Sequence, residues 1–397
     1  MRKNKSFLFI TALLASALIG LSSCAGIYDL YDKAPSPHGS GKTGTVNEEL
    51  YAEPVHLKDD SSDPDVLTDS LSAVIIDTLG NYKPCFSADR RISTSELNAA
   101  LRKTADAAPD LFWTNGYAIS SGSGSDECQV YFKMIDDFTP EELKKMHDEL
   151  EEAAGKIIAQ IPEDSDDYEK ILFVHDYIVN STEYDFEGAG KGEAGLYSTA
   201  YGCLVNGKAV CEGYAEAFQY IMNKIGIESG ICTGIADSQP HGWNYVKLNG
   251  NYYWIDVTWD DPQSEPDAED EETEKTDVPG IRHTYFLIND ELLFRSREAD
   301  PEYKDTVPEC TSLEENYYMK KEAFFTEYSF ENIAGLISQD DGTRKLEMMF
   351  TGKEAYDEAV NRLFKQDEIL GLADYTELSE MINWSYDERM YELFIYY

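Results

Sequence analysis

An Asn-Gly pair between two aromatic and β-branched runs constrains this chain more than any other feature. The runs are 241–248 and 251–259, and Asn249-Gly250 separates them. Asn-Gly in that setting is the strongest short signal for a two-residue hairpin turn. If the loop is those two residues, Leu248 pairs with Asn251, and every later pair follows from that one. The sequence therefore predicts an antiparallel hairpin of defined register.

This register brings His241 and Asp256 together. Trp243 faces Asp256 across the hairpin. His241 faces Thr258, so His241 and Asp256 become diagonal neighbours on one face. A carboxylate beside a His fixes its tautomer and stabilises its charged form, as a base that activates a thiol requires. A surface His near an edge Asp explains the spacing equally well. A register shift of one residue would put the two side chains on opposite faces.

Cys211 opens a predicted amphipathic helix. The turn at 206–208 precedes it, and Gly226 stands where a C-terminal glycine cap belongs. A thiol at a helix N-terminus meets the positive end of the dipole and free N–H groups, which favour the thiolate and can hold an oxyanion. Taken alone, a Cys on such a helix is more often a core residue. The apolar stripe has spacings of four, three and four, at Tyr214, Phe218, Ile221 and Ile225.

Three ordered segments resemble the bacterial transglutaminase-like superfamily. Residues 201–215, which read YGCLVNGKAVCEGYA, resemble its nucleophile segment, and HGWN at 241–244 resembles its His segment. WIDVTWDDP at 254–262 resembles its Asp segment, and 171–178 resembles the helix that precedes the three. The resemblance covers about 165–290. It implies an α+β fold with a papain-like core, in which the nucleophile helix packs on an antiparallel sheet.

The resemblance implies a catalytic triad of Cys, His and Asp. In it Cys211 is the nucleophile, His241 is the base and acid, and Asp256 orients the His. Attack on a carbonyl carbon would give a thioester, which water or an amine releases. Tyr201 is a candidate for contact with the oxyanion. One departure is Cys203, which stands where a small residue is usual. Neither a metal nor an organic cofactor is implied.

Several residues near the motifs have structural alternatives. Trp243 and Trp259 are candidates for an acyl-substrate groove, and packing within the sheet explains them at least as well. His175 lies on the apolar face of its helix and is better explained as a hydrogen-bonded core residue than as a second base. Glu212 and Glu216 follow Cys211, and we expect them to point away from it because nearby carboxylates raise a thiol pKa.

The first 24 residues have the features of an export signal. Basic residues precede an apolar run at 7–20 that is too short to span a bilayer comfortably. The following LSSC, ending at Cys24, resembles the lipobox of bacterial lipoproteins. An ordinary cleaved signal or a buried Cys is the alternative. The expectation is an exported, lipid-anchored protein of the bacterial cell envelope, held to the membrane through Cys24.

The net charge of the chain limits the classes of partner that it can bind. The 397 residues include 76 acidic and 33 basic side chains, for a net charge of −43. Nucleic-acid binding needs clustered Lys and Arg, so this class is excluded. The expected substrate is a protein, a peptide or a cell-wall peptide.

Composition and pattern divide the chain into five parts. Residues 1–23 form the signal peptide, and 24–70 form a flexible tether. Residues 71–164 form an N-terminal α/β extension with a helix and a hairpin. Residues 165–295 form the catalytic core, and 296–397 form a small C-terminal α/β module. Capping boxes at Ser93 and Thr139 predict helix starts, and 344–350, 353–364 and 390–396 read as strand, helix and strand.

The function that these features favour is thiol-dependent hydrolysis or acyl transfer at peptide, isopeptide or amide bonds. Peptidase activity is favoured slightly over cross-linking, because no calcium loop is visible. The six cysteines after Cys24 contain no CxxC pair, which argues against a zinc site built from thiolates. The alternative is a non-catalytic binding or assembly module on an inherited fold.

Overall fold

The computed structural model describes residues 55–57, 63–121, 126–136, 138–191, 194–262, 280–301, 303, 307–339, 344–375 and 383–397. The predicted signal peptide, Cys24 and most of the predicted tether lie outside these residues. Within the described part of the chain, no helix is both long and apolar enough to cross a membrane.

The chain forms two compact units, which are described separately. Unit 1 comprises residues up to 159 together with 182–223 and 239–241. Unit 2 comprises 160–181, 224–238 and 242–397. Each unit combines helices with β-sheet, which confirms the predicted α+β class. The domain boundaries at 164 and 295 stay predictions.

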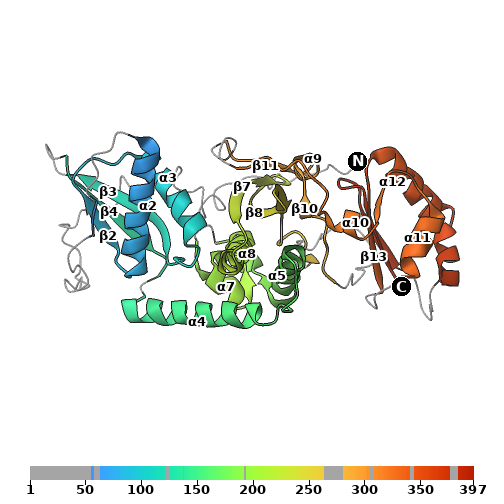
Figure 1. Ribbon diagram of the computed structural model, residues 1–397, viewed down its shortest axis with the longest axis horizontal. Coiled ribbons are helices and arrows are strands. Elements are labelled where there is room, and N and C mark those ends of the chain that lie inside the picture. The colour runs from blue at the N-terminus through green and yellow to red at the C-terminus, as the bar shows by residue number, and fades with distance from the viewer. Residues whose placement is uncertain are drawn as a thin grey trace, which may run out of the picture. The chain divides into compact units, whose positions relative to one another are not determined.

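Unit 1 contains a four-stranded sheet with the order β1-β2-β4-β3. The β1–β2 pair is parallel, and β2–β4 and β3–β4 are antiparallel. Figure 1 shows α2 and α3 beside these strands. The elements of the unit are β1 (Val55–Leu57), α2 (Pro64–Gly80), β2 (Cys85–Ala88), α3 (Thr94–Ala107), β3 (Thr114–Ser121), β4 (Cys128–Met134), α4 (Pro140–Ile158), β5 (Glu183–Tyr184), α6 (Phe186–Ala189), α7 (Ala200–Leu204), β6 (Lys208–Ala209) and α8 (Cys211–Ile225).

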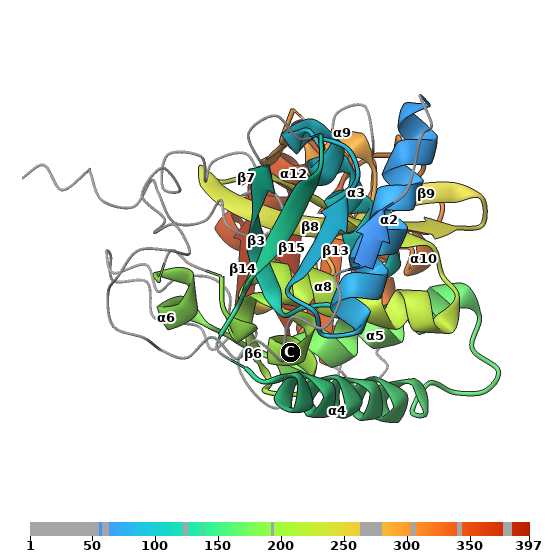
Figure 2. The ribbon, with the colours of Figure 1, turned by 90° about the vertical axis from the view of Figure 1, so that its left-hand side faces the viewer.

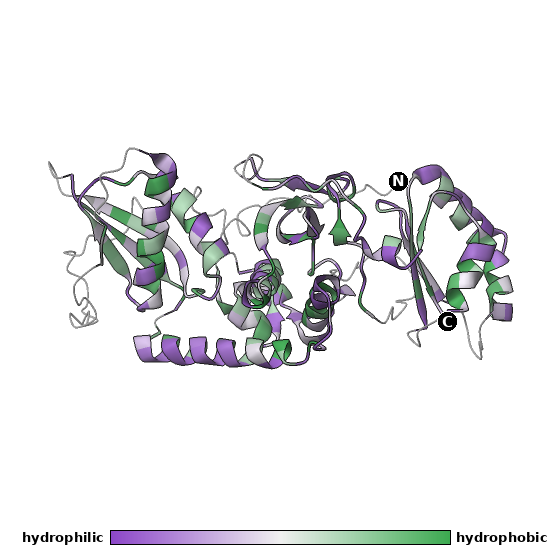
Figure 3. Ribbon diagram, viewed as in Figure 1, coloured by the Kyte–Doolittle hydropathy of each residue, from purple (hydrophilic) through white to green (hydrophobic). Residues whose placement is uncertain are grey.

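Local sequence signals set the starts of α3 and α4. Ser93 and Glu96 form a complete capping box before α3, and Thr139 and Glu142 form another before α4. Each box satisfies backbone N–H groups that have no partner within the helix. Figure 3 shows α4 as mostly hydrophilic, with hydrophobic residues nearer its C-terminal end. Both predicted helix starts are confirmed.

The folded region begins earlier than predicted. Helix α2 starts at Pro64, where the Asp63 side chain accepts a hydrogen bond from the N–H of Asp65. Leu71, Ile75 and Leu79 are buried along one face of the helix. The predicted end of the tether at residue 70 is therefore wrong, because the cap and the first turns of this helix lie before it. Figure 2 shows α2 and the strands of this sheet from the side.

Unit 2 contains a five-stranded sheet, ordered β10-β9-β8-β7-β11, and a four-stranded sheet, ordered β12-β13-β15-β14. Figure 1 shows α11 and α12 on one side of β13. The elements are α5 (Asp167–Ser181), β7 (Ser229–Ala236), β8 (Gln239–Leu248, whose first three residues belong to unit 1), β9 (Asn251–Ile255), β10 (Phe286–Ile288), α9 (Asp290–Leu293), β11 (Arg297–Ala299), α10 (Tyr317–Lys320), β12 (Phe324–Phe325), α11 (Phe330–Ile337), β13 (Lys345–Phe350), α12 (Lys353–Val360), β14 (Asn383–Asp387) and β15 (Glu392–Tyr396).

The predicted hairpin is confirmed with its register. Leu248 pairs with Asn251, and the antiparallel pairing continues to Asn244 opposite Ile255. Asn249 and Gly250 both have positive φ, at 52° and 86°. A two-residue turn of the type that matches strand twist requires positive φ at both positions, and Asn and Gly tolerate it best. The elements β13, α12 and β15 also agree with the strand, helix and strand predicted there.

Candidate active site

Cys211 is the first residue of α8. The N–H of Tyr214 donates to the carbonyl of Val210 at 3.1 Å, so the helical hydrogen bonds begin around the thiol. Cys211 is half-buried, and the other five described cysteines are buried. Burial raises the pKa of the Cys85, Cys232 and Cys310 thiols, which makes them poor nucleophiles. No two described cysteines form a disulfide.

Two motif glycines hold the start of α8 close to the chain before it. A Cβ on Gly213 would lie 2.8 Å from the Cβ of Ala209 and from the carbonyl oxygen of Tyr197. A Cβ on Gly202 would meet the carbonyl of Leu196 at 2.0 Å. Neither approach leaves room for a side chain. The segment from 196 to 213 is therefore packed backbone against backbone, which fixes where Cys211 begins its helix.

Glu216 lies five residues after Cys211 in α8, and its side chain binds a backbone N–H group. Its Oε2 accepts a hydrogen bond from the N–H of Ala200, the first residue of α7, at 3.1 Å. Burial, followed by the charge of Glu212, raises the pKa of Glu216 well above its ordinary value. The carboxyl group thus ties α8 to α7. Its orientation relative to Cys211 stays a prediction.

The two other predicted triad residues are His241 and Asp256. His241 is in β8 and is 8% exposed, and Asp256 directly follows β9 and is completely buried. The N–H of Trp259 donates to Oδ1 of Asp256 at 3.2 Å. Arg297 donates to Oδ2 from Nε at 3.2 Å and from Nη2 at 2.8 Å. Both oxygens of this carboxylate are therefore hydrogen-bonded.

Arg297 is enclosed by aromatic rings. Its guanidinium lies 4.2 Å from the ring centroid of Trp259 and 4.2 Å from that of Tyr285. Burial opposes its charge, but Asp256 and Tyr285 outweigh that effect and raise the pKa of Arg297. Flat rings on a guanidinium restrict its orientation and add a cation–π attraction. This fixed cation in turn holds the Asp256 carboxylate in one position.

The sequence from 155 to 259 matches the profile of the Transglutaminase-like superfamily. The chain contains a transglutaminase-like domain. No protein among those with curated functions matches the chain. The matched range includes Cys211, His241 and Asp256, and their roles stay a prediction.

Solved structures similar to this chain include a TGase, a proposed cysteine protease from Cytophaga hutchinsonii and a proposed protease from Parabacteroides distasonis. Their sequence identities are 15%, 16% and 12%, with TM-scores of 0.28, 0.23 and 0.23. They cover 57%, 36% and 35% of this chain. This chain covers 63%, 61% and 35% of theirs, so it spans less than two thirds of each.

Within the transglutaminase-like domain, the hydroxyl of Tyr201 already has an acceptor. It donates to Oε2 of Glu149 in α4 at 2.8 Å, and its ring stacks on Phe112 with centroids 5.3 Å apart. Burial and the Glu149 carboxylate raise the pKa of Tyr201 to about 12. A hydroxyl bound to a carboxylate must exchange that partner before it can stabilise an oxyanion. The proposed contact of Tyr201 with the oxyanion stays a prediction.

The two tryptophans proposed for a substrate groove differ in exposure. Trp243 is 1% exposed and packs edge-on against Trp254, with ring centroids 6.5 Å apart. It belongs to the core of the sheet, as the packing alternative states. Trp259 is half-buried and covers Arg297. A groove role is therefore better suited to Trp259 than to Trp243.

His175 is a fully buried, hydrogen-bonded residue of α5, as its position on an apolar face indicated. It belongs to a network of buried charges in unit 2 that the sequence analysis did not predict. Nδ1 of His175 and Nε2 of His283 both bind Oδ1 of Asp176. Burial opposes charge on His283, but Glu347 and Asp176 raise its pKa to about 9. One ligand atom from each of His175, Asp176 and His283 lies within 4.8 Å of the other two.

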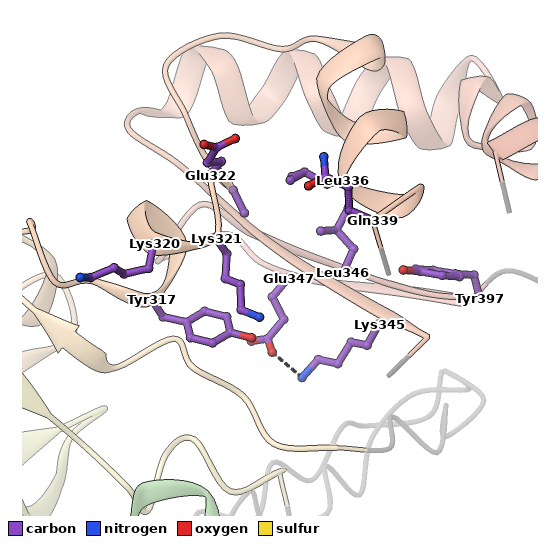
Figure 4. Close-up of a pocket in the computed structure, with 11 residues that line it drawn as sticks. Tyr317, Lys320, Lys321, Glu322, Leu336, Gln339, Lys345, Leu346, Glu347 and Tyr397 are labelled. Atoms are coloured by element: carbon purple, nitrogen blue, oxygen red, sulfur yellow. Dashed lines mark ion pairs between the residues drawn. The ribbon is translucent and has the colours of Figure 1, made fainter. Parts of the chain in front are cut away.

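A pocket of about 400 Å³ lies beside this network in unit 2. Glu347 lines it and pairs with Lys345 at 2.8 Å, as Figure 4 shows. Tyr317 also lines the pocket and stacks on His283, with centroids 3.8 Å apart. None of the residues expected to carry out catalysis lines this pocket.

Proposed function

We propose that this protein is a cysteine hydrolase or acyltransferase of the transglutaminase-like superfamily, with Cys211 as nucleophile, His241 as base and acid, and Asp256 as the orienting carboxylate. The profile match at 155–259 supports this function at the level of the family. The observation that carries the proposal is the partial exposure of Cys211, the first residue of α8, where the other described cysteines are buried.

The reaction begins with proton transfer from the Cys211 thiol to His241. The thiolate attacks the carbonyl carbon of a peptide, isopeptide or other amide, and the N–H groups at the start of α8 are suited to bind the oxyanion. His241 then gives its proton to the leaving amine, and a thioester remains on Cys211. Water, deprotonated by His241, releases the acid. An amine in place of water would give a cross-link. Of the two reactions, we favour hydrolysis.

Asp256 has a clear part in this scheme. A carboxylate beside an imidazole keeps it in the productive tautomer and stabilises the imidazolium that forms. Two bonds from Arg297 and one from Trp259 keep the Asp256 carboxylate in place. We further propose that the protein acts in the bacterial cell envelope, anchored through a lipidated Cys24, on a protein or cell-wall peptide.

Alkylation of the full chain with iodoacetamide at pH 5 to 9 tests the triad, with mass spectrometry read at each Cys. Cys211 should react well below the ordinary thiol pKa of about 8.5, while buried cysteines react slowly. In His241→Ala, the pH profile of Cys211 alkylation should move to higher pH. In Asp256→Ala it should move in the same direction by a smaller amount. His147→Ala is the matched control, because His147 binds Asp110 at 3.0 Å and lies outside the matched range.

Turnover of a substrate then distinguishes hydrolysis from acyl transfer to an amine. A peptide substrate in the presence of a primary amine gives a free acid if water releases the thioester and an amide if the amine does. Trapped acyl groups should appear on Cys211 alone. An inert Cys211 in the folded protein, or one labelled equally in all variants, would instead favour a non-catalytic binding module.

A further inference from the structure

Three side chains of unit 2, outside the predicted triad, direct ligand atoms at one point. His175 and Asp176 come from α5, and His283 precedes β10. Oδ1 of Asp176 lies 2.9 Å from Nδ1 of His175 and 3.1 Å from Nε2 of His283. One ligand atom from each residue lies within 4.8 Å of the others. We propose that these three residues form a binding site for a divalent transition metal, and specifically for zinc.

The ligand set is one that zinc prefers. Two imidazole nitrogens and one carboxylate oxygen, with a fourth position left to water, make a common zinc site. Zinc binds such atoms at about 2.0 to 2.2 Å, which puts neighbouring ligands of a tetrahedron roughly 3.3 to 3.6 Å apart. The two distances to Asp176 are 2.9 and 3.1 Å. Small movements of the side chains are enough to admit the ion.

The second nitrogen of each His supports the assignment most strongly. Nε2 of His175 lies 3.1 Å from Oδ2 of Asp260, and Nδ1 of His283 lies 2.9 Å from Oε1 of Glu347. A metal-binding His characteristically donates its other N–H to a carboxylate, which fixes the ring and makes it a better ligand. Here both rings have that partner, and both carboxylates are buried.

The supporting carboxylates and rings are themselves held in place. Asp260 accepts hydrogen bonds from the N–H of Tyr285, and Glu347 accepts one from the N–H of His283. Tyr317 lies flat on the His283 ring, at an interplanar angle of 5°. Phe286 meets His175 edge-on, with centroids 5.1 Å apart. The imidazoles are therefore oriented before any ion arrives, which lowers the cost of binding.

The partial exposure of Asp176 leaves a route by which the ion can enter the site. His175 is completely buried and His283 is 6% exposed, but the side chain of Asp176 is 33% exposed. A fourth ligand can thus be water on the Asp176 side. Neither His is the predicted base, so the ion would lie outside the proposed triad. It would join α5 to the segment before β10 and, through Glu347, to β13.

A second cluster of three potential metal ligands serves as a comparison, and it consists of Asp110, His147 and Glu151. There a single nitrogen, Nε2 of His147, faces both carboxylates, at 3.0 Å and 3.9 Å. The other nitrogen lies 3.3 Å from the hydroxyl of Tyr82, so this ring has no supporting carboxylate. Exposed groups of this kind commonly occur without a metal. His147 is therefore the control position.

Titration of the chelator-treated full chain with zinc chloride, followed by calorimetry and thermal melting, tests the site. One high-affinity ion per chain and a rise in melting temperature are expected. His283→Asn should weaken this binding at least 100-fold, because the Asn amide can still reach Glu347 from the Nδ1 position but leaves no ligand at Nε2. Asp176→Asn should also weaken it, by about tenfold or more. His147→Asn should bind zinc like the unaltered protein.

Two results would overturn the proposal: zinc affinity unchanged in both site variants, or affinity lost equally in His147→Asn. If the site variants fail to fold, crystals of the unaltered protein grown with zinc decide the question. An anomalous peak above the zinc edge, and none below it, should lie among His175, Asp176 and His283. A peak found only elsewhere, or no peak, would exclude the site.

Discussion

Arg297 donates two hydrogen bonds to one oxygen of Asp256, at 3.2 and 2.8 Å, and neither side chain is exposed to solvent. The pair joins β11, at one edge of the five-stranded sheet, to the end of β9, and strands β8 and β7 lie between these two. A carboxylate held in this way keeps one orientation. If Asp256 orients the catalytic His, Arg297 is its positioning residue.

Removal of Arg297 should be strongly destabilising. Arg297→Ala leaves the Asp256 charge buried without its main partner, and loss of one member of a buried pair costs about 3 to 5 kcal/mol. Arg297→Lys keeps the charge but not the forked geometry of the guanidinium. Its free energy of unfolding should therefore lie between those of the unaltered protein and Arg297→Ala. Urea denaturation measures both. In the folded fraction of Arg297→Lys, the pH profile of Cys211 alkylation should move toward that of Asp256→Ala.

Arg389→Ala is the matched control for this prediction. Arg389 pairs with Asp237 and with Asp387, but its side chain is 45% exposed. Exposed pairs contribute about 0 to 1 kcal/mol, so its removal should change the free energy of unfolding by no more than that. Equal losses in Arg297→Ala and Arg389→Ala would show that the burial of the Asp256 pair has no special energetic effect.

Glu216 should make stability depend on pH. Its pKa in the folded state is raised above its unfolded value of 4.5 by burial and by Glu212. The folded state therefore binds this proton more tightly, and stability falls as pH rises from 4.5 through the raised pKa. Glu216→Gln removes this pH-dependent loss of stability. The amide oxygen of the Gln can still accept a hydrogen bond from the N–H of Ala200.

Melting temperatures from pH 4.5 to 8 test this expectation. The unaltered protein should lose stability relative to Glu216→Gln as the pH rises, and the two should be most similar at the acid end. A difference between them that is constant across this range would contradict the assignment. Cys211 alkylation in the same variant shows whether the charge also influences the thiol.

Gly213 should tolerate no side chain. In Gly213→Ala the new Cβ would meet Ala209 and Tyr197 at 2.8 Å, and overpacking of this kind costs about 1 to 3 kcal/mol. Movement of the first turn of α8 should also slow Cys211 alkylation. Gly155→Ala in α4 is the control, because no described atom beyond its chain neighbours and the adjacent helix backbone lies within 4 Å of its new Cβ. It should raise stability by about 0.5 to 1 kcal/mol. Equal effects of the two changes would argue against close packing at Gly213.

The elements that the sequence predicted correctly depend on neighbours along the chain. The turn at Asn249-Gly250 sets the register of β8 and β9 because two adjacent residues with positive φ are enough. The start of α8 at Cys211 follows from the turn before it and the apolar stripe after it. The start of α2 was missed although Asp63-Pro64 is itself a cap signal, because the acidic composition before residue 70 suggested a tether.

Contacts between distant residues could not be predicted in this way. Asp176 and His283 are separated by 107 positions, and Arg297 follows Asp256 by 41. No periodicity relates such residues, and pairing of charges depends on which strands become neighbours. The hydroxyl of Tyr201 likewise binds Glu149, 52 positions away. A composition rich in carboxylates offers many partners for each Arg and His, and only the fold selects among them.

The strand order of the C-terminal sheet also dictates when that sheet can form. Strand β15 lies between β13 and β14 and pairs with both, so β14 cannot join the sheet until residues 392–396 are in place. A nascent chain that has not released β15 from the ribosome therefore carries Met348 and Met349 of β13 with no partner on the β15 side. Factors that bind unfolded chains would encounter an incomplete apolar surface here, and this surface closes only when the last strand is inserted.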